Sequence, residues 1–149
     1  MYIYGTGQAP ELVFPGNQTI TTLGGGFYGP FGVAVDGSGN VYVGESGNNA
    51  VKGMPPGCGS ASCVATLGGG FLAPTGVAVD GDGNVYVADT NNDAVKEVPI
   101  GCGSSCVSEL GYLASPEGVT LDGSGNLYVV SFYRPETGVT ELNVTSPPS

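Results

Sequence analysis

The sequence predicts an all-β protein built from repeats. Residues 76–89 hold two short runs of alternating β-branched residues around the turn cluster Asp80-Gly81-Asp82-Gly83-Asn84, a pattern typical of a β-hairpin. The same unit recurs at residues 32–45 and 118–131, with spacings of 44 and 42 residues. A fixed period of this length indicates a solenoid, a propeller or another repeat array.

The composition agrees with short strands joined by tight turns. The 149 residues include 28 glycines and 11 prolines, yet 40% of the chain is hydrophobic. Disordered chains rich in glycine and proline are usually polar, so this combination favours tight turns between buried strands.

Two full repeats are expected, and each contains four strands. The first covers residues 24–67, opens with Gly24-Gly25-Gly26-Phe27, and has its strands at residues 33–35, 41–43, 50–54 and 64–67. The second covers residues 68–110, opens with Gly68-Gly69-Gly70-Phe71, and has its strands at residues 77–79, 85–87, 94–98 and 107–110. Four short strands in about 44 residues correspond to one blade of a β-propeller.

Both ends of the chain carry incomplete repeats. Residues 111–142 form a partial third blade, with strands expected at 119–121, 127–130 and 138–142, and residues 143–149 form a tail rich in proline and serine. Residues 1–23 contain two further expected strands, 11–14 and 19–23, which match the end of a repeat. These N-terminal strands are expected to complete a blade.

The hairpins carry a recognisable motif. Pro-x-Gly-Val-Ala-Val-Asp-Gly-x-Gly-Asn-Val-Tyr-Val opens residues 30–48 and residues 74–92, and residues 116–131 match it less closely. These segments resemble the NHL repeat of β-propellers. The resemblance implies an NHL-type propeller with about three four-stranded blades per chain, which is half of a six-bladed ring, because members of this family usually close with six blades.

Three blades are too few to close a ring, since propellers use about four to eight blades. An open half-ring would expose unpaired strand edges. We therefore expect the chain to bind itself, with the N-terminal strands of one copy completing the third blade of another. The result would be a homodimeric six-bladed ring or an open polymer, and the alternative is that the chain is a piece of a longer six-bladed protein.

The four cysteines form two pairs, Cys58/Cys63 and Cys102/Cys106, between the third and fourth strands of consecutive repeats. Such closely spaced pairs predict disulfides in an oxidising compartment, which places the protein outside the cell, in a periplasm or on a cell surface. A zinc site is disfavoured, because the chain has no histidine and the spacing is not that of a zinc knuckle. No apolar stretch is long enough to span a membrane.

The net charge excludes two classes of partner. The chain has 13 acidic and three basic residues, for a formal net charge of −10. Nucleic acids and anionic membrane surfaces are bound through clustered lysine and arginine, which Lys52, Lys96 and Arg134 do not provide.

Catalysis finds little support in the sequence, and we expect no resident cofactor. Without histidine, the commonest general base and metal ligand is missing. The lyases of this family depend on histidines that have no counterpart here. An enzyme using Glu45, Asp89 or Glu117, such as a lyase, lactonase or glycosidase, stays open as an alternative. Calcium is a further possibility at the Asp80 turn, although its twelfth position is Asn91 and its flanks are strands, unlike an EF-hand. An aspartate that caps its own turn is the preferred interpretation.

A ligand-binding face is expected where the loops before the first strand and after the second strand meet, opposite the Asp-Gly-x-Gly-Asn turns and the cysteine loops. The resemblance to NHL propellers implies binding on this face. Its candidate residues are Phe31, Glu45, Asn48, Thr75, Asp89, Asn92, Asp93, Glu117, Phe132, Tyr133 and Arg134.

Two of these assignments have alternatives. Glu45 and Asp89 are more readily explained by hydrogen bonds to backbone amides, or by ion pairs with Lys52 and Lys96 that tie the blades together. Residues 132–136 break the repeat pattern and serve either a ligand or the contact between chains.

The sequence therefore predicts a secreted or cell-surface binding and assembly module. Its ligand is an unidentified protein, peptide or glycan, and its copies associate by completing each other's blades. A purely structural filament subunit is the third interpretation, since strand exchange that fails to close a ring propagates.

Overall fold

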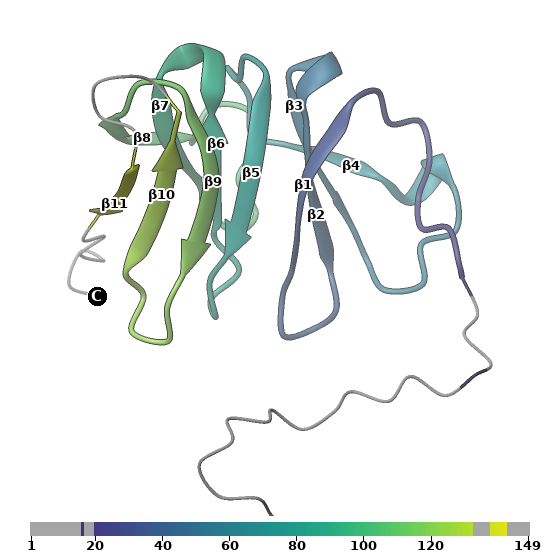
Figure 1. Cartoon of the computed structure of the whole chain (residues 1–149). Coiled ribbons are helices and arrows are strands. Elements are labelled where there is room, and N and C mark those ends of the chain that lie inside the picture. The colour runs from purple at the N-terminus through teal and green to yellow at the C-terminus, as the bar shows by residue number, and fades with distance from the viewer. Residues whose placement is uncertain (1–15, 17–19, 133–137, 143–149) are drawn as a thin grey trace, which may run out of the picture.

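The computed structural model describes residue 16 and residues 20–132 and 138–142. These residues form three antiparallel sheets, two with four strands and one with three, standing side by side (Figure 1). Helical structure in this part of the chain is limited to three short 3-10 helices. The fold is an all-β propeller arc, as the sequence predicts.

We call the sheets blade 1, blade 2 and blade 3. Blade 1 consists of β1 (Pro30–Val35), β2 (Val41–Glu45), β3 (Ala50–Met54) and β4 (Ala65–Leu67), with η1 (Ser46–Asn48) and η2 (Ala61–Cys63) in its loops. Blade 2 consists of β5 (Pro74–Val79), β6 (Val85–Asp89), β7 (Ala94–Val98) and β8 (Ser108–Tyr112), with η3 (Thr90–Asn92) after β6. Blade 3 consists of β9 (Pro116–Leu121), β10 (Leu127–Ser131) and β11 (Gly138–Leu142).

The first strands begin three residues before their expected starts. Pro30 pairs with Glu45, and the register then shifts before Val33, so a bulge at Phe31-Gly32 lies inside β1. Blade 2 repeats this arrangement from Pro74.

Other expected strands also differ at their ends, by one or two residues. β8 continues to Tyr112, which pairs with Ala94, so two residues that we expected in the third repeat belong to blade 2. Residues 20–23 form no strand in this single chain, and the expected strand at residues 11–14 lies outside the described residues.

The inner strands β1, β5 and β9 lie next to one another, and glycine allows their close approach. A Cβ atom at Gly32 would lie 2.4 Å from the carbonyl oxygen of Thr75, and one at Gly76 would lie 2.5 Å from that of Glu117. Only a residue without a side chain fits at either position.

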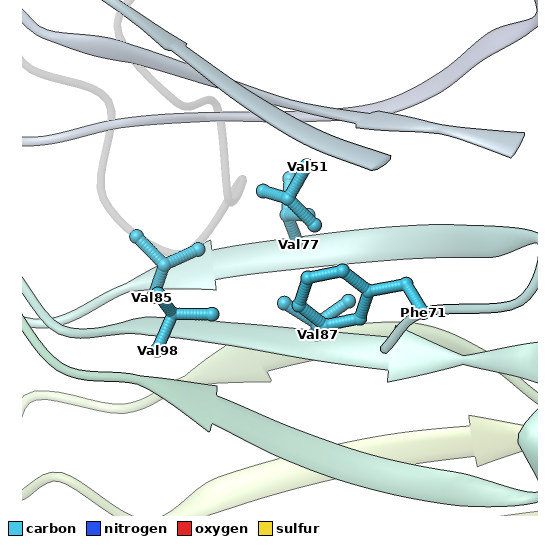
Figure 2. Packing of buried hydrophobic residues seen from close by; sticks show 6 residues of the cluster. All are labelled: Val51, Phe71, Val77, Val85, Val87 and Val98. Carbon is cyan, nitrogen blue, oxygen red and sulfur yellow. The ribbon is translucent and has the colours of Figure 1, made fainter. Parts of the chain in front are cut away.

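The hydrophobic core lies between blades. Val51 of blade 1 packs with Val77, Val85 and Val87 of blade 2, and Figure 2 shows Val51 directed towards Val77 of the neighbouring sheet. Ala78, Tyr86 and Val95 of blade 2 pack in the same way against Leu127 and Val129 of blade 3. Blades 1 and 2 thus each bury one face against the following blade, which is how a propeller builds a core from thin sheets.

The cysteines pair within their own blades. Cys58 is bonded to Cys63 in blade 1 and Cys102 to Cys106 in blade 2, as the sequence predicts. The described part of the chain contains no helix that is long and apolar enough to cross a membrane.

Candidate functional site

The segments that lead into the inner strands meet the loops after the second strands at one end of the blades, which we call the loop face. In blade 1 the amide of Gly47 donates a hydrogen bond to the carbonyl of Tyr28 at 3.1 Å. In blade 2 the amide of Asn91 donates to the carbonyl of Leu72, also at 3.1 Å. The opposite end, the hairpin face, carries the β1–β2, β5–β6 and β9–β10 turns, which point the same way (Figure 1).

The carboxylate of Asp89 joins three parts of blade 2. It accepts hydrogen bonds from the amide of Leu72 and from Asn92 Nδ2, both at 2.7 Å, and Lys96 Nζ lies 2.6 Å from its Oδ2. Lys96 also donates to the carbonyl of Gly70 at 2.7 Å. The Asp89 side chain is fully buried. Its oxygens are therefore engaged inside the blade and do not face the surface.

Glu45 has the same position in blade 1, with looser contacts. Its Oε1 accepts hydrogen bonds from the amide of Tyr28 and from Asn48 Nδ2. Its Oε2 is the one buried side-chain oxygen or nitrogen among the described residues that has no hydrogen-bond partner. Lys52 Nζ lies 4.0 Å from this oxygen and donates instead to Thr66 Oγ1 at 2.7 Å. The ion pair of blade 1 is thus weaker than that of blade 2.

These contacts confirm the expected bonds to amides and lysines, but they correct one detail. Both carboxylates act within a blade, and a different pair of residues ties the blades together. Asn49 Oδ1 accepts a hydrogen bond from the amide of Ala73 at 2.7 Å, and Asp93 Oδ1 accepts one from the amide of Ser115 at 2.8 Å. Asn49 and Asp93 both have left-handed backbones, with φ of 54° and 52°. Asparagine and aspartate tolerate this conformation better than most residues.

Phe31, Thr75 and Glu117 occupy the same position in the first strands of the three blades, but they have different surroundings. Thr75 is buried, and its hydroxyl donates to the carbonyl of Glu117 across the contact between blades 2 and 3, at 2.8 Å. Phe31 is 71% exposed, and the side chain of Glu117 is also exposed. Phe31 and Glu117 can therefore meet a ligand, whereas Thr75 supports the fold.

Large apolar side chains are exposed at the loop face. They come from the lead-in segments, from the bulge in β1, from the end of β8 and from the residue after β10. These residues are Tyr28, Phe31, Leu72, Tyr112 and Phe132. Of the candidates in the divergent loop, Phe132 is described and exposed, while Tyr133 and Arg134 lie outside the described residues.

On the hairpin face, each turn aspartate binds its own turn. Asp80 Oδ1 accepts hydrogen bonds from the amides of Asp82 and Asn84, and its Oδ2 accepts from Asn84 Nδ2 and the hydroxyl of Tyr86. The turns at Asp36 and Asp122 have the same bonds. Within the described residues, no group of three His, Cys, Asp or Glu side chains could hold a metal ion.

These hydrogen bonds lower the pKa of the three turn aspartates. The side-chain bond from Asn40 is the main cause at Asp36, and the backbone bond from Asn126 is the main cause at Asp122. At Asp80 partial burial acts first and raises the pKa, but the bonds from Asn84, Tyr86 and Asp82 outweigh it.

Acid is therefore expected to destabilise the fold. A carboxylate whose pKa is lower in the folded state adds stability above its unfolded pKa of about 3.9, and this stability is lost as the pH falls through the folded-state pKa. Urea unfolding followed from about pH 6 to about pH 2 should show the loss. In the triple variant Asp36→Asn, Asp80→Asn, Asp122→Asn the loss should be smaller, and an unchanged pH profile would contradict this assignment.

Comparison with known families identifies the repeats. A family model, described as NHL repeat, matches residues 27–54 and 71–96. These two segments are NHL repeats. The matched residues cover the lead-in segment and the first three strands of blades 1 and 2. No curated protein sequence matches this chain.

Solved structures with the same fold include propellers of different functions. The nidogen/laminin complex matches with a TM-score of 0.65 and 20% identity over 75% of this chain and 43% of that chain. Hydrazine synthase of Kuenenia stuttgartiensis matches with a TM-score of 0.61 and 18% identity, covering 87% of this chain and 36% of that chain.

A third match is a catalytically inactive virginiamycin B lyase from Staphylococcus aureus with quinupristin. Its TM-score is 0.56 and its identity 13%, covering 79% of this chain and 42% of that chain. The chain thus spans less than half the length of each of these three proteins, and identities this low establish the fold alone.

Proposed function

We propose that this NHL-type propeller is a binding and assembly module that works outside the cell. It binds a protein or peptide through the loop face and associates through its terminal blades. The observation that carries the proposal is the set of large apolar side chains exposed on the loop face, which includes Phe31 and Leu72. Aromatic and large apolar groups of this kind supply most of the energy in protein interfaces.

The chemistry of the partner follows from the charge of the chain. A formal net charge of −10 attracts basic partners and repels acidic ones. We therefore expect a peptide segment with apolar and basic side chains. A location outside the cell is supported by the two disulfides, which persist in oxidising compartments. The nidogen/laminin complex is an example of a propeller that has a protein partner.

The carboxylate enzyme is the less favoured alternative. Asp89 and Glu45 are fully buried, and each is bonded to a backbone amide of its own blade. Only Glu117 of the three expected acids is exposed. Hydrolysis by two carboxylates needs both groups beside the substrate, and two of these three do not reach the surface.

Selection from a random peptide library displayed on phage tests the proposal. Immobilised wild-type chain should enrich basic peptides with apolar residues. The double variant Phe31→Ser, Leu72→Ser should bind the selected peptides at least about tenfold more weakly, because an interface loses about 1–2 kcal/mol when a central apolar side chain is removed. Neither side chain is buried, so the variant should fold normally.

Ile100→Ser is the matched control, since Ile100 is 70% exposed but lies in the β7–β8 loop at the hairpin face. Its binding should equal that of the wild type. Equal binding by the double variant would remove the loop face from the proposal, and a library that yields no binder would remove the binding function.

A further inference from the structure

The two contacts between blades follow one pattern. We call the face that a blade turns to the following blade its back, and the face that it turns to the preceding blade its front. Val51 on the back of blade 1 is buried against Val77 and Val85 on the front of blade 2. Val95 on the back of blade 2 is buried against Leu127 on the front of blade 3. Val51 and Val95 have no exposed surface.

The back of blade 3 carries the same residue without a cover. Val139 pairs with Val130, as Val95 pairs with Ala88 and Val51 with Gly44, so it has the position of the two buried valines. In this chain Val139 is 70% exposed. An apolar position that is buried twice and exposed once indicates a blade contact that a single chain leaves unfilled.

The front of blade 1 is uncovered in the same way along its first strand, β1. Val33 corresponds to Val77 in the pairing of the first two strands, yet Val33 is 66% exposed and Val77 only 6%. Val35, two residues further along β1, is also exposed. The two ends of the arc therefore present the two halves of the contact that the internal blades make.

Among the described residues, the first strand of blade 3 also has no neighbouring strand on its outer side, unlike the first strands of blades 1 and 2. Gly32 and Gly76 face the backbone of the next blade, but a Cβ atom at Gly118 would have Val130 of its own blade as its nearest neighbour, at 3.8 Å. The space that a neighbouring strand fills at the first two glycines is thus free at the third. The residues equivalent to Val130 are Gly44 in blade 1 and Ala88 in blade 2. Because Val130 is larger, a neighbouring strand must lie farther from blade 3 than the internal blades lie from each other.

Within the described residues blade 3 has three strands where blades 1 and 2 have four, and the chain contains a segment that matches the fourth. β11 pairs with β10 as β3 pairs with β2, so it is a third strand, and its outer edge has no partner among the described residues. Thr22-Leu23-Gly24-Gly25-Gly26-Phe27 repeats the residues of Thr66-Leu67-Gly68-Gly69-Gly70-Phe71. The latter run contains the end of the fourth strand β4 and leads into blade 2.

The register of that fourth strand can be carried over. Leu67 pairs with Val51 in blade 1, which places Leu23 opposite Val139 in a completed blade 3. Leu23 and Val139 are both exposed in the single chain, and Ile20 is almost fully exposed. Among the described residues blade 3 has one strand fewer than blades 1 and 2, and residues 20–23 would supply one strand.

We propose that the back of blade 3 binds the front of blade 1 of a second copy of this chain, and that residues 20–23 of that copy form the fourth strand of blade 3. This inference rests on the assembly role proposed above and specifies its contact. Two copies make the contact twice and give six blades, which lies within the range of closed propellers. Both exposed faces and the open edge of β11 are then covered.

Sedimentation velocity of the whole chain tests the proposal. The wild type should sediment as a pair of chains, with twice the single-chain mass of 14.8 kDa. Val139→Asp and Val33→Asp place a charge in the contact and should each weaken association at least about 100-fold, giving a single chain. Because both valines are exposed in the single chain, each variant should keep the circular dichroism spectrum of the folded chain and should unfold cooperatively on heating. Ile100→Asp, with the same 70% exposure as Val139, should associate as the wild type.

Mixing the two variants tests the head-to-tail arrangement. A pair formed by one Val139→Asp chain and one Val33→Asp chain carries both charges in one contact and leaves the other contact unaltered, so the mixture should regain a species of twice the mass. A wild type that stays at 14.8 kDa, a Val139→Asp chain that still pairs, or a mixture that stays single would overturn the proposal. A long polymer would show that the contact forms, and it would overturn the proposal that two chains close into a six-bladed ring. The peptide selection reads the loop face. Repeating it on the single chain of Val139→Asp tests peptide binding without the contact between copies, so the two proposals fail separately.

Discussion

Replacing Asp89 by alanine is expected to lower the free energy of unfolding by about 3–5 kcal/mol, which is typical when one partner of a buried ion pair is removed. The substitution leaves Lys96, the amide of Leu72 and the side chain of Asn92 without their common acceptor. The side chain of Lys96 is only 13% exposed and has lost most of its water on folding, and an unsatisfied buried donor costs about 1–3 kcal/mol. Urea denaturation at neutral pH measures the loss.

Asp82→Ala is the matched control for this prediction. Asp82 is exposed in the β5–β6 turn, and its side chain makes no hydrogen bond in the structure, so its removal should change the stability by less than about 0.5 kcal/mol. If Asp89→Ala is as stable as the wild type but loses peptide binding, the carboxylate serves a ligand and not the fold. Glu45→Ala should cost less than Asp89→Ala, because Lys52 Nζ lies 4.0 Å from Glu45 whereas Lys96 Nζ lies 2.6 Å from Asp89.

The parts of the fold that depend on nearby residues could be predicted from the sequence. The third strands at Ala50–Met54 and Ala94–Val98 were expected with these same bounds. The reason is that alternating side chains and turn residues act within a few positions of the chain. The turn aspartates behave as expected for the same reason, since each binds amides two and four residues away.

The starts of the first strands depend on more distant contacts. Pro30 and Pro74 join their strands only because the chain bulges before the register resumes at Val33 and Val77. The alternation of apolar and other residues begins only after the bulge. A pattern with a period of two therefore cannot show that the strand already starts three residues earlier. The extension of β8 to Tyr112 likewise follows from its pairing with Ala94 and from no local signal.

The candidate site was harder to predict, because burial there is decided by the neighbouring blade. Thr75 and Phe31 occupy the same position in two repeats, yet Thr75 is buried by blade 3 contacts and Phe31 is exposed. Asn49 was missed as a contact between blades. A signal was available, because Asn49-Ala50-Val51-Lys52 and Asp93-Ala94-Val95-Lys96 place a residue that tolerates positive φ before each third strand.

Gly76→Ala is expected to destabilise the fold by about 1–3 kcal/mol, the usual cost of forcing extra atoms into a packed interior. The new Cβ atom would lie 2.5 Å from the carbonyl oxygen of Glu117 and 2.9 Å from the Cα atom of Gly118, so β5 and β9 must separate. This loss outweighs the gain of about 0.4–1 kcal/mol that alanine brings by restricting the unfolded chain. Thermal melting and urea unfolding both measure the net change.

Gly118→Ala provides the comparison that isolates the contact between blades. Gly118 has the same position in blade 3, but its nearest neighbour would be Val130 Cβ at 3.8 Å, an ordinary van der Waals distance. Both substitutions are made in the Val139→Asp background, so that only the single chain is measured. There Gly118→Ala should be neutral or stabilising by up to about 1 kcal/mol, because only the effect on the unfolded chain remains. Equal losses at both glycines would show that the position itself disfavours a side chain, and that the neighbouring blade is not the cause.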